Sequence, residues 1–213
     1  MNEDRFADMT EILHLGLKQQ DALAELNRVV TERIRTADYS RVHELFEELL
    51  AIAGEDDIKK MAQKEERLDG ISDDLSGIRI GLLKEKELLA AMRDTNNAYI
   101  DALQQEIEAA TAYLERPANR EIPDVITRQD TLQKRVQELM TTHSVGVSFS
   151  AQIKLAEDNL ASLSDRIWHV MVNLLPLLRG RISMEYSKVL VAEIQKMMQG
   201  NAATVQDAGT VTD

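Results

Sequence analysis

The feature that most constrains this chain is a heptad repeat that runs from residue 68 to residue 113. Its members recur at alternating steps of three and four residues, which is the a/d pattern of a coiled-coil helix. They are Leu68, Ile71, Leu75, Ile78, Leu82, Glu85, Leu89, Met92, Asn96, Tyr99, Leu103, Glu106, Ala110 and Tyr113. The repeat predicts one helix over residues 56–116, in which only Gly70, Gly77 and Gly81 permit bending. With about 1.5 Å of rise per residue, that helix is roughly 90 Å long.

A second repeat of the same kind follows a loop predicted between Pro117 and Pro123. It predicts a helix over residues 124–199, with Asp124 near its N-terminus. Pro176 lies inside this helix, and because proline lacks a backbone N–H we expect a kink there. The repeat consists of Val125, Leu132, Val136, Leu139, His143, Gly146, Ser150, Ile153, Glu157, Leu160, Ser164, Ile167, Met171, Leu174 and Leu178.

Two long helices joined by a short loop should fold back on each other as an antiparallel hairpin. A loop centred near residue 120 pairs residue i with roughly residue 240 − i, which places Asn96 in the neighbourhood of His143 and Glu85 in the neighbourhood of Lys154. Polar members of one repeat then face polar members of the other, and buried polar layers of this kind set the register of coiled coils. The predicted fold is all-α, an elongated helical bundle built on a long antiparallel coiled-coil hairpin.

Helical spacing of apolar residues predicts two further helices, over residues 4–36 and 40–53. We expect Ser40 to cap the second and Gly54 to end it. Its inner face should consist of Val42, Leu45, Phe46, Leu49 and Leu50. Both helices should cover the far end of the hairpin, and Trp168, Leu174 and Leu175 should lie in that thicker part of the bundle. The sequence thus predicts a single elongated domain over residues 1–200, followed by a disordered tail over residues 201–213.

Composition and charge exclude several classes of protein. The chain of 213 residues has no Cys, 9 Gly and 4% aromatic residues, which excludes disulfide scaffolds, cysteine nucleophiles and most β architectures. A net charge of −12 argues against nucleic-acid binding. No apolar run is long enough to span a membrane and the acidic start is unlike a signal peptide, so we expect a cytoplasmic protein.

One segment departs from the acidic character of the rest. Residues 166–199 are apolar and mildly basic, with more basic than acidic side chains. A segment of this kind suits contact with a partner helix, or peripheral contact with the inner face of an anionic membrane. We therefore expect protein partners or self-association through helical surfaces.

Motifs for catalysis and for cofactor binding are missing from the sequence. It contains no G-x-S-x-G turn, no phosphate-binding G-x-x-x-x-G-K loop and no G-x-G-x-x-G. His43-Glu44 starts like a zinc-protease helix, but Glu47 occupies the place of the second histidine. The sequence predicts neither an enzyme nor a cofactor or metal site.

Residues 141–150 leave two interpretations open. Most of them are small, hydroxyl-bearing or imidazole side chains. They suit the close approach of two helices, which is the interpretation we favour. The alternative is a polar pocket in which His143 and neighbouring hydroxyl groups bind an oxyanion.

Two segments of the chain match the signature of a known family. The first consists of residues 151–159, Leu163, Ile167, Asn173, Pro176, Leu177 and Arg179. The second consists of residues 96–99, Leu103, Ile107 and residues 109–110. They resemble, respectively, the P-Q-I-R-L-I-Q-x-N…L…K-I…N-T-I-P-L-W-K signature and the N-x-x-Y-x-x-L…I-A-A-G segment of the TelA/KlaA family of toxic-anion (tellurite) resistance proteins. The departures are Ala151 for Pro, Asp158 for Asn, Leu178 for Trp and Thr111 for Gly.

The resemblance implies an all-helical cytoplasmic protein connected with resistance to tellurite or other toxic anions. The family has no agreed catalytic residues, so none is carried over to this chain. The signature and the polar seam together suggest a functional surface made of Asn96, Tyr99, His143, Gln152, Lys154, Asn159, Asn173, Pro176 and Arg179.

Three hypotheses of function follow. The leading one is a non-enzymatic TelA-like stress-response and toxic-anion resistance protein that works by partner binding or assembly. The alternative is a coiled-coil structural adaptor or envelope-associated scaffold with no role in anions. The third is a helical protein that binds or converts an anion.

Overall fold

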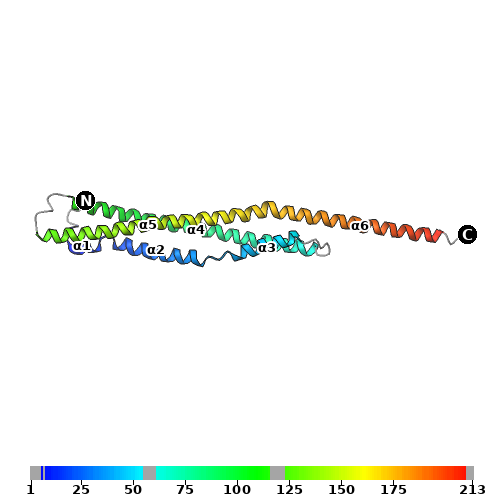
Figure 1. Ribbon diagram of the computed structural model, residues 1–213, viewed down its shortest axis with the longest axis horizontal. Coiled ribbons are helices and arrows are strands. Elements are labelled where there is room, and N and C mark those ends of the chain that lie inside the picture. Colours follow the sequence, from blue (N-terminus) through cyan, green and yellow to red (C-terminus); the bar gives the residue numbers. More distant parts are fainter. Residues whose placement is uncertain (1–5, 7, 55–60, 116–122, 210–213) are drawn as a thin grey trace. The chain divides into compact units, whose positions relative to one another are not determined.

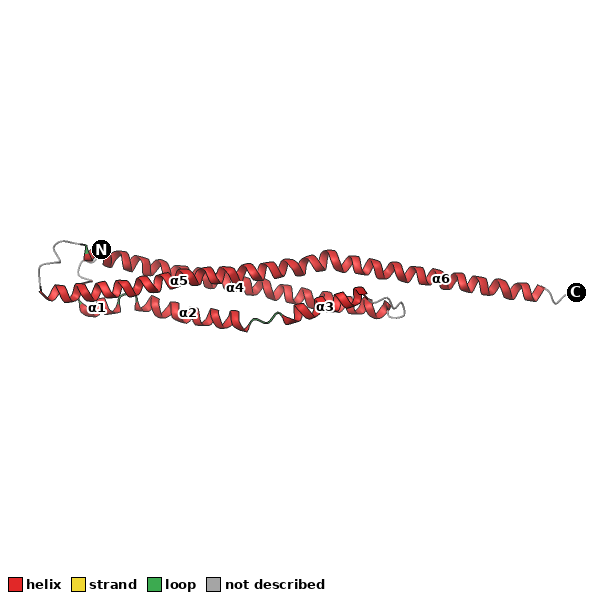
Figure 2. Ribbon diagram, viewed as in Figure 1, coloured by secondary structure: helices red, strands yellow, loops and turns green. Residues whose placement is uncertain are grey.

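The computed structural model describes residues 6, 8–54, 61–115 and 123–209. Within these residues every regular element is a helix (Figure 2), in agreement with the predicted all-α class. The elements are α1 (Met9–His14), α2 (Leu17–Thr36), α3 (Ser40–Gly54), α4 (Met61–Leu114), α5 (Pro123–His169), the π-helical turn η4 (Val170–Leu174) and α6 (Leu175–Gly209). Helices α4 and α5 pack antiparallel as the predicted hairpin (Figure 1).

Contacts divide the chain into two compact units, where the sequence predicts one domain over residues 1–200. Unit 1 comprises Met1–Ala37 and Leu83–Ser162, and unit 2 comprises Asp38–Leu82 and Leu163–Asp213. Each unit therefore contains a part of α4 and a part of α5.

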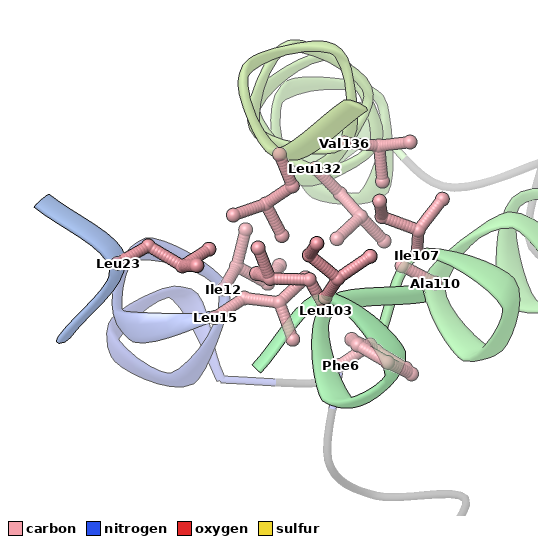
Figure 3. Close-up of a cluster of buried hydrophobic side chains, with 11 residues drawn as sticks. Phe6, Ile12, Leu15, Leu23, Leu103, Ile107, Ala110, Leu132 and Val136 are labelled. Atoms are coloured by element: carbon pink, nitrogen blue, oxygen red, sulfur yellow. The ribbon is translucent and has the colours of Figure 1, made fainter. Parts of the chain in front are cut away.

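The core of unit 1 is an apolar cluster that α1, α2, α4 and α5 share. In Figure 3, Leu132 and Val136 of α5 point toward Leu103 and Ile107 of α4. Leucine and isoleucine side chains of this size each contribute about 1.5–3 kcal/mol when they leave water. The cluster consists of Phe6, Ile12, Leu15, Leu23, Ile100, Leu103, Ile107, Ala110, Leu132, Val136 and Leu139.

A break at Gly16 divides the predicted helix over residues 4–36 into α1 and α2. Gly16 has φ +67°, a left-handed conformation that side chains with a Cβ rarely adopt. A Cβ at this position would lie 2.7 Å from Leu139 Cδ2. The prediction of one continuous helix over these residues is therefore wrong. The left-handed turn at Gly16 ends α1, places Leu15 in the core and starts α2 in a new direction.

At Asn96 the register of the hairpin in unit 1 lies within three residues of the predicted pairing. Asn96 is buried and donates from Nδ2 to the carbonyl oxygen of Gly146 at 3.0 Å, in the predicted neighbourhood of His143. Glu85 binds Arg33 of α2. Gly146 is the one glycine of α5, and its missing side chain lets the two backbones approach closely enough for this hydrogen bond.

Residues 141–150 follow the close-approach interpretation. A Cβ on Gly146 would lie 2.9 Å from Ile100 Cγ1, which is closer than real side chains pack. Several hydroxyl groups donate to carbonyl oxygens four residues earlier in α5, for example Thr141 to Gln137 and Ser148 to Ser144, both at 3.0 Å. These hydroxyl hydrogens are therefore used within the helix.

In unit 2, α3 begins at Ser40, but the capping side chain is Asp38. Its Oδ1 accepts the Ser40 backbone N–H at 2.9 Å, and this hydrogen bond lowers the pKa of Asp38 below its ordinary value. Arg41 of α3 binds Asp74 of α4 at 2.7 Å. The guanidinium of Arg79 stacks over Trp168, 4.6 Å from the ring centroid.

In unit 2, burial differs among the residues predicted to lie in the thicker part of the bundle or on the inner face of α3. Leu175 is buried, but Trp168 and Leu174 are exposed. On α3, Val42, Leu45 and Leu49 are buried as predicted. Leu50, assigned to the same inner face, is exposed, so the inner face of α3 is narrower than the sequence predicts.

The π turn η4 lies where the sequence predicts a disturbance by Pro176. Proline has no N–H to donate to the carbonyl of Val172, four residues earlier. The Leu175 N–H bonds instead to the Val170 carbonyl, five residues earlier, which closes a π turn just before the proline.

The ends of the helices also differ from the predicted bounds. Helix α6 continues to Gly209, beyond the predicted stop at Gly200, since a lone glycine costs a helix only about 1 kcal/mol. The last residues of the predicted tail, 210–213, and residues 56–60 of the predicted first long helix lie outside the described residues.

Candidate functional site

Unit 2 contains an apolar groove between α3 and the segment formed by η4 and α6. Its volume is about 470 Å³, within the range of roughly 300–1,000 Å³ typical of ligand pockets. One wall is formed by α3, the other by η4 and α6. The lining residues are Phe46, Leu49, Leu50, Ala53, Val170, Leu174, Leu177, Leu178 and Arg181.

Apolar side chains on both walls of this α3/α6 groove face solvent. Leu50 on α3 is 67% exposed and Leu177 on α6 is 70% exposed. Because these two leucines are so exposed, the groove presents an apolar surface to solvent, and a surface of this kind is typical of a binding site for a partner.

Arg181 is the cation of the α3/α6 groove. Its Nη1 donates to the carbonyl oxygen of Ala53 at 3.3 Å, and its Nε donates to Glu185 at 3.1 Å. Ala53 lies in the last turn of α3, where the partial negative charge of the helix C-terminus favours a cation. Arg181 therefore joins α6 to the end of α3 and places a positive charge beside apolar side chains.

Unit 1 contains a second groove, between α2 and α5. It has a volume of about 360 Å³, and its lining is a mixture of apolar, amide and hydroxyl side chains with one guanidinium group, that of Arg35. Gln152 and Asn159 contribute the amides. The lining residues are Thr31, Ile34, Arg35, Phe149, Gln152, Leu155, Ala156 and Asn159.

Six of the nine predicted surface residues belong to unit 1 and three belong to unit 2. In unit 1, Asn96 is buried in the hairpin, while Tyr99 and His143 are half-buried. Gln152 and Asn159 line the α2/α5 groove. Lys154 is exposed and binds Asp158 within the same helix at 2.8 Å.

The remaining three predicted residues are exposed in unit 2. Asn173 Nδ2 lies 2.9 Å from His169 Nδ1, and Arg179 binds Asp69 of α4. Pro176 acts through the backbone, since the π turn that it accompanies brings Val170 and Leu174 to the α3/α6 groove.

Sequence reasoning missed the α3 wall of the groove. Its signal was present, because Phe46, Leu49, Leu50 and Ala53 follow the i, i+3, i+4, i+7 spacing of one helix face. Leu49 belongs both to this face and to the buried face of α3. The sequence therefore predicts a single broad inner face where the structure has a buried stripe and a groove wall.

Neither a metal-binding cluster nor a membrane-spanning helix occurs among the described residues. No three His, Asp or Glu side chains in this part of the chain lie close enough together to hold a metal ion. No helix among the described segments has the length and apolarity needed to cross a bilayer.

Comparison with known proteins finds two distant homologues. The chain is 23% identical over 222 aligned positions to TelA-like protein SSP1345 of Staphylococcus saprophyticus, covering 95% of this chain and 56% of that protein. It is 23% identical over 146 positions to the uncharacterized protein YaaN of Bacillus subtilis, covering 59% of this chain and 38% of YaaN. The chain thus spans about half the length of these relatives, or less.

No family model matches the chain, and no solved structure matches it. The homology to a TelA-like protein agrees with the resemblance carried by residues 151–179 and 96–110.

Proposed function

We propose that this chain is a TelA-like protein of toxic-anion resistance that acts in the cytoplasm without catalysis, by binding a protein partner at the α3/α6 groove. Distant homology to a TelA-like protein supports the link to resistance. The single observation that carries the binding mechanism is the pair of exposed leucines, Leu50 and Leu177, on facing walls of an apolar groove.

The free energy gained by burying apolar side chains favours the binding of a partner in the groove. Covering a leucine side chain stabilises a complex by roughly 1.5–3 kcal/mol before the costs of association are subtracted. The lining is apolar on both walls, and Arg181 supplies a polar contact that orients what binds.

The experiment is complementation of a host strain that lacks the gene. Wild-type chain, the double variant Leu50→Gln with Leu177→Gln, and Leu13→Gln are expressed at equal level, and growth on tellurite is measured. Leu13 is an exposed leucine of α1 in unit 1 and serves as the matched control. We expect the double variant to lose resistance and the control to retain it. A deletion strain with unchanged tellurite sensitivity would refute the resistance role.

A second candidate is a structural adaptor with no role in anions. It is favoured by the exposed apolar side chains that continue along α6 beyond the groove, among them Met184 and Leu190. The same strains test it: a growth or shape defect without tellurite that the double variant fails to repair would support the adaptor role. Flotation of the purified chain with anionic vesicles tests the version that docks on a membrane.

A further inference from the structure

One face of α6 carries exposed apolar side chains at intervals of seven residues. Leu177, Met184 and Val191 are 70%, 60% and 52% exposed, respectively. Seven residues are close to two helical turns, so the three side chains lie along one narrow line on the helix. The line starts at the wall of the α3/α6 groove, because Leu177 belongs to both.

Two cations lie between these apolar residues with the same period. Arg181 and Lys188 are also seven residues apart, and both are exposed. Together the five residues form what we call the α6 stripe: Leu177, Arg181, Met184, Lys188 and Val191. Its order is that of a heptad seam with apolar residues at one core position and cations at the other.

We infer that the α6 stripe binds an amphipathic helix of a partner protein, which packs apolar residues against Leu177, Met184 and Val191 and faces Arg181 and Lys188 with Asp or Glu. This inference rests on the proposed function and specifies its partner. The heptad period selects a helix as the binding element. From Leu177 to Val191 the stripe is roughly 21 Å long, which is too long for a small molecule to cover.

Charge selects an acidic partner. Residues 166–196 contain five basic side chains and two acidic ones, in a chain with a net charge of −12. Arg181 already pairs with Glu185 of α6, whereas docking also takes Lys188 out of water. Carboxylates on the partner compensate for the loss of water at Lys188 and add to the pairing at Arg181.

Two other occupants fit this stripe less well. A second copy aligned in parallel would place Arg181 against Arg181 and Lys188 against Lys188, which like charges disfavour. A helix that lies in a membrane surface keeps its basic residues on the face opposite its apolar one. In the α6 stripe the cations alternate with apolar residues on the same line.

The test uses the full chain and two labelled helical peptides of about 21 residues. Both carry Leu at one core position of each heptad; one carries Glu at the other core position and its twin carries Lys. Fluorescence anisotropy measures the dissociation constant of each. We expect the Glu peptide to bind about tenfold more tightly than the Lys peptide, because only its carboxylates pair with Arg181 and Lys188.

Variants locate the binding surface. The double variant Leu177→Gln with Met184→Gln should lose binding of the Glu peptide, and Lys188→Glu should reduce or reverse the preference for it. Leu190→Gln is the matched control, since Leu190 is an exposed leucine on another face of the same helix. Glutamine is a good helix former, so these changes leave α6 intact.

Several results would overturn the inference. They are equal binding of both peptides, no binding of the Glu peptide, or a loss with Leu190→Gln as large as with the double variant. Vesicles of phosphatidylcholine and phosphatidylglycerol that bind the wild type but not the double variant would identify a membrane instead. A wild-type dimer that the double variant converts to a monomer in sedimentation would identify a second copy.

The resistance assay separates this inference from the proposed function. If neither peptide binds and the Leu177→Gln/Met184→Gln variant still loses resistance, partner binding stands and the acidic helix is wrong. If the Glu peptide binds as expected and that variant keeps full resistance, the stripe recognises acidic helices and the proposed role of partner binding in resistance is wrong.

Discussion

Asn96 of α4 is joined to Gly146 of α5 by a hydrogen bond of 3.0 Å from the side-chain amide to the backbone carbonyl oxygen, inside the core of unit 1. Its other amide atom, Oδ1, is buried and has no hydrogen-bond partner among the described residues. The pair therefore sets the alignment of the two helices at a cost in stability, as buried asparagines do in coiled coils.

Two substitutions of Asn96 should separate the contribution of its hydrogen bond from the cost of its buried Oδ1. Asn96→Ala should lower the free energy of unfolding by about 1 kcal/mol, since it removes the hydrogen bond and leaves a small cavity. Asn96→Leu should keep or raise stability, because it replaces an amide with a buried unpartnered oxygen by an apolar side chain. Urea denaturation followed by circular dichroism measures both, with the exposed Gln104→Ala as control. A larger loss for leucine than for alanine would contradict the interpretation.

Gly146→Ala should destabilise the chain by about 1–3 kcal/mol. The new Cβ would lie 2.9 Å from Ile100 Cγ1, and crowding of this degree forces the two helices apart. The matched control is Gly77→Ala in α4, where a Cβ meets no atom within 4 Å. That change should stabilise the helix by up to about 1 kcal/mol. Ile100→Ala removes the crowded atom, so the combined Gly146→Ala/Ile100→Ala variant should lose less stability than the sum of the two single losses in thermal unfolding; strict additivity would place the crowding elsewhere.

Arg93 and Glu157 form an ion pair across α4 and α5, at 2.7 Å between Nη1 and Oε2. The Glu157 side chain is 4% exposed and that of Arg93 is 25% exposed. Removal of one partner leaves the other charge unpaired, and the loss of stability is larger when that unpaired charge is more deeply buried. Arg93→Ala should therefore lower the free energy of unfolding by about 3 kcal/mol, because it leaves the buried Glu157 carboxylate unpaired. Glu157→Ala should lower it by less.

A double-mutant cycle checks this asymmetry. The combined Arg93→Ala/Glu157→Ala variant should lose less than the sum of the two single losses, because no unpaired charge remains. Lys154, with Nζ at 3.9 Å from Glu157 Oε2, partly compensates in the Arg93 variant. Strict additivity in urea denaturation would show that the pair contributes nothing as a pair.

Tellurite should leave the melting temperature of the purified chain unchanged at millimolar concentration. The proposed function requires no anion site, and a ligand stabilises a protein only if it binds the folded state preferentially. Differential scanning fluorimetry with tellurite, with phosphate as comparison, measures the shift. A rise that increases with tellurite concentration would favour the third hypothesis, in which the chain binds the anion directly.

The fold was largely predictable, because helix period and chain geometry act locally. The two heptad repeats predicted the long helices, and members such as Leu89, Leu103, Leu132 and Ile153 are buried as a seam requires. The register was not predictable to the residue, since it depends on where Gly146 allows the backbones to approach.

The candidate site was predictable only in part. The signature residues Gln152 and Asn159 line one groove, and Pro176 accompanies the π turn beside the other. The exposed pair Leu50 and Leu177 could not be told from core leucines, because a helical period says which residues share a face but not whether anything covers it.

By itself the sequence determined the helices, their heptad repeats and the place of the disturbance at Pro176, because these depend on neighbours along the chain. The tertiary structure decided which face of each helix is covered by another helix and which is exposed to solvent. Leu175 is 2% exposed and Leu177 is 70% exposed, although they are the same residue two positions apart. Gly16 turns the chain at φ +67° while Gly77 lies in an uninterrupted helix. The difference in each case is the presence or absence of packing from distant segments, which no local pattern encodes.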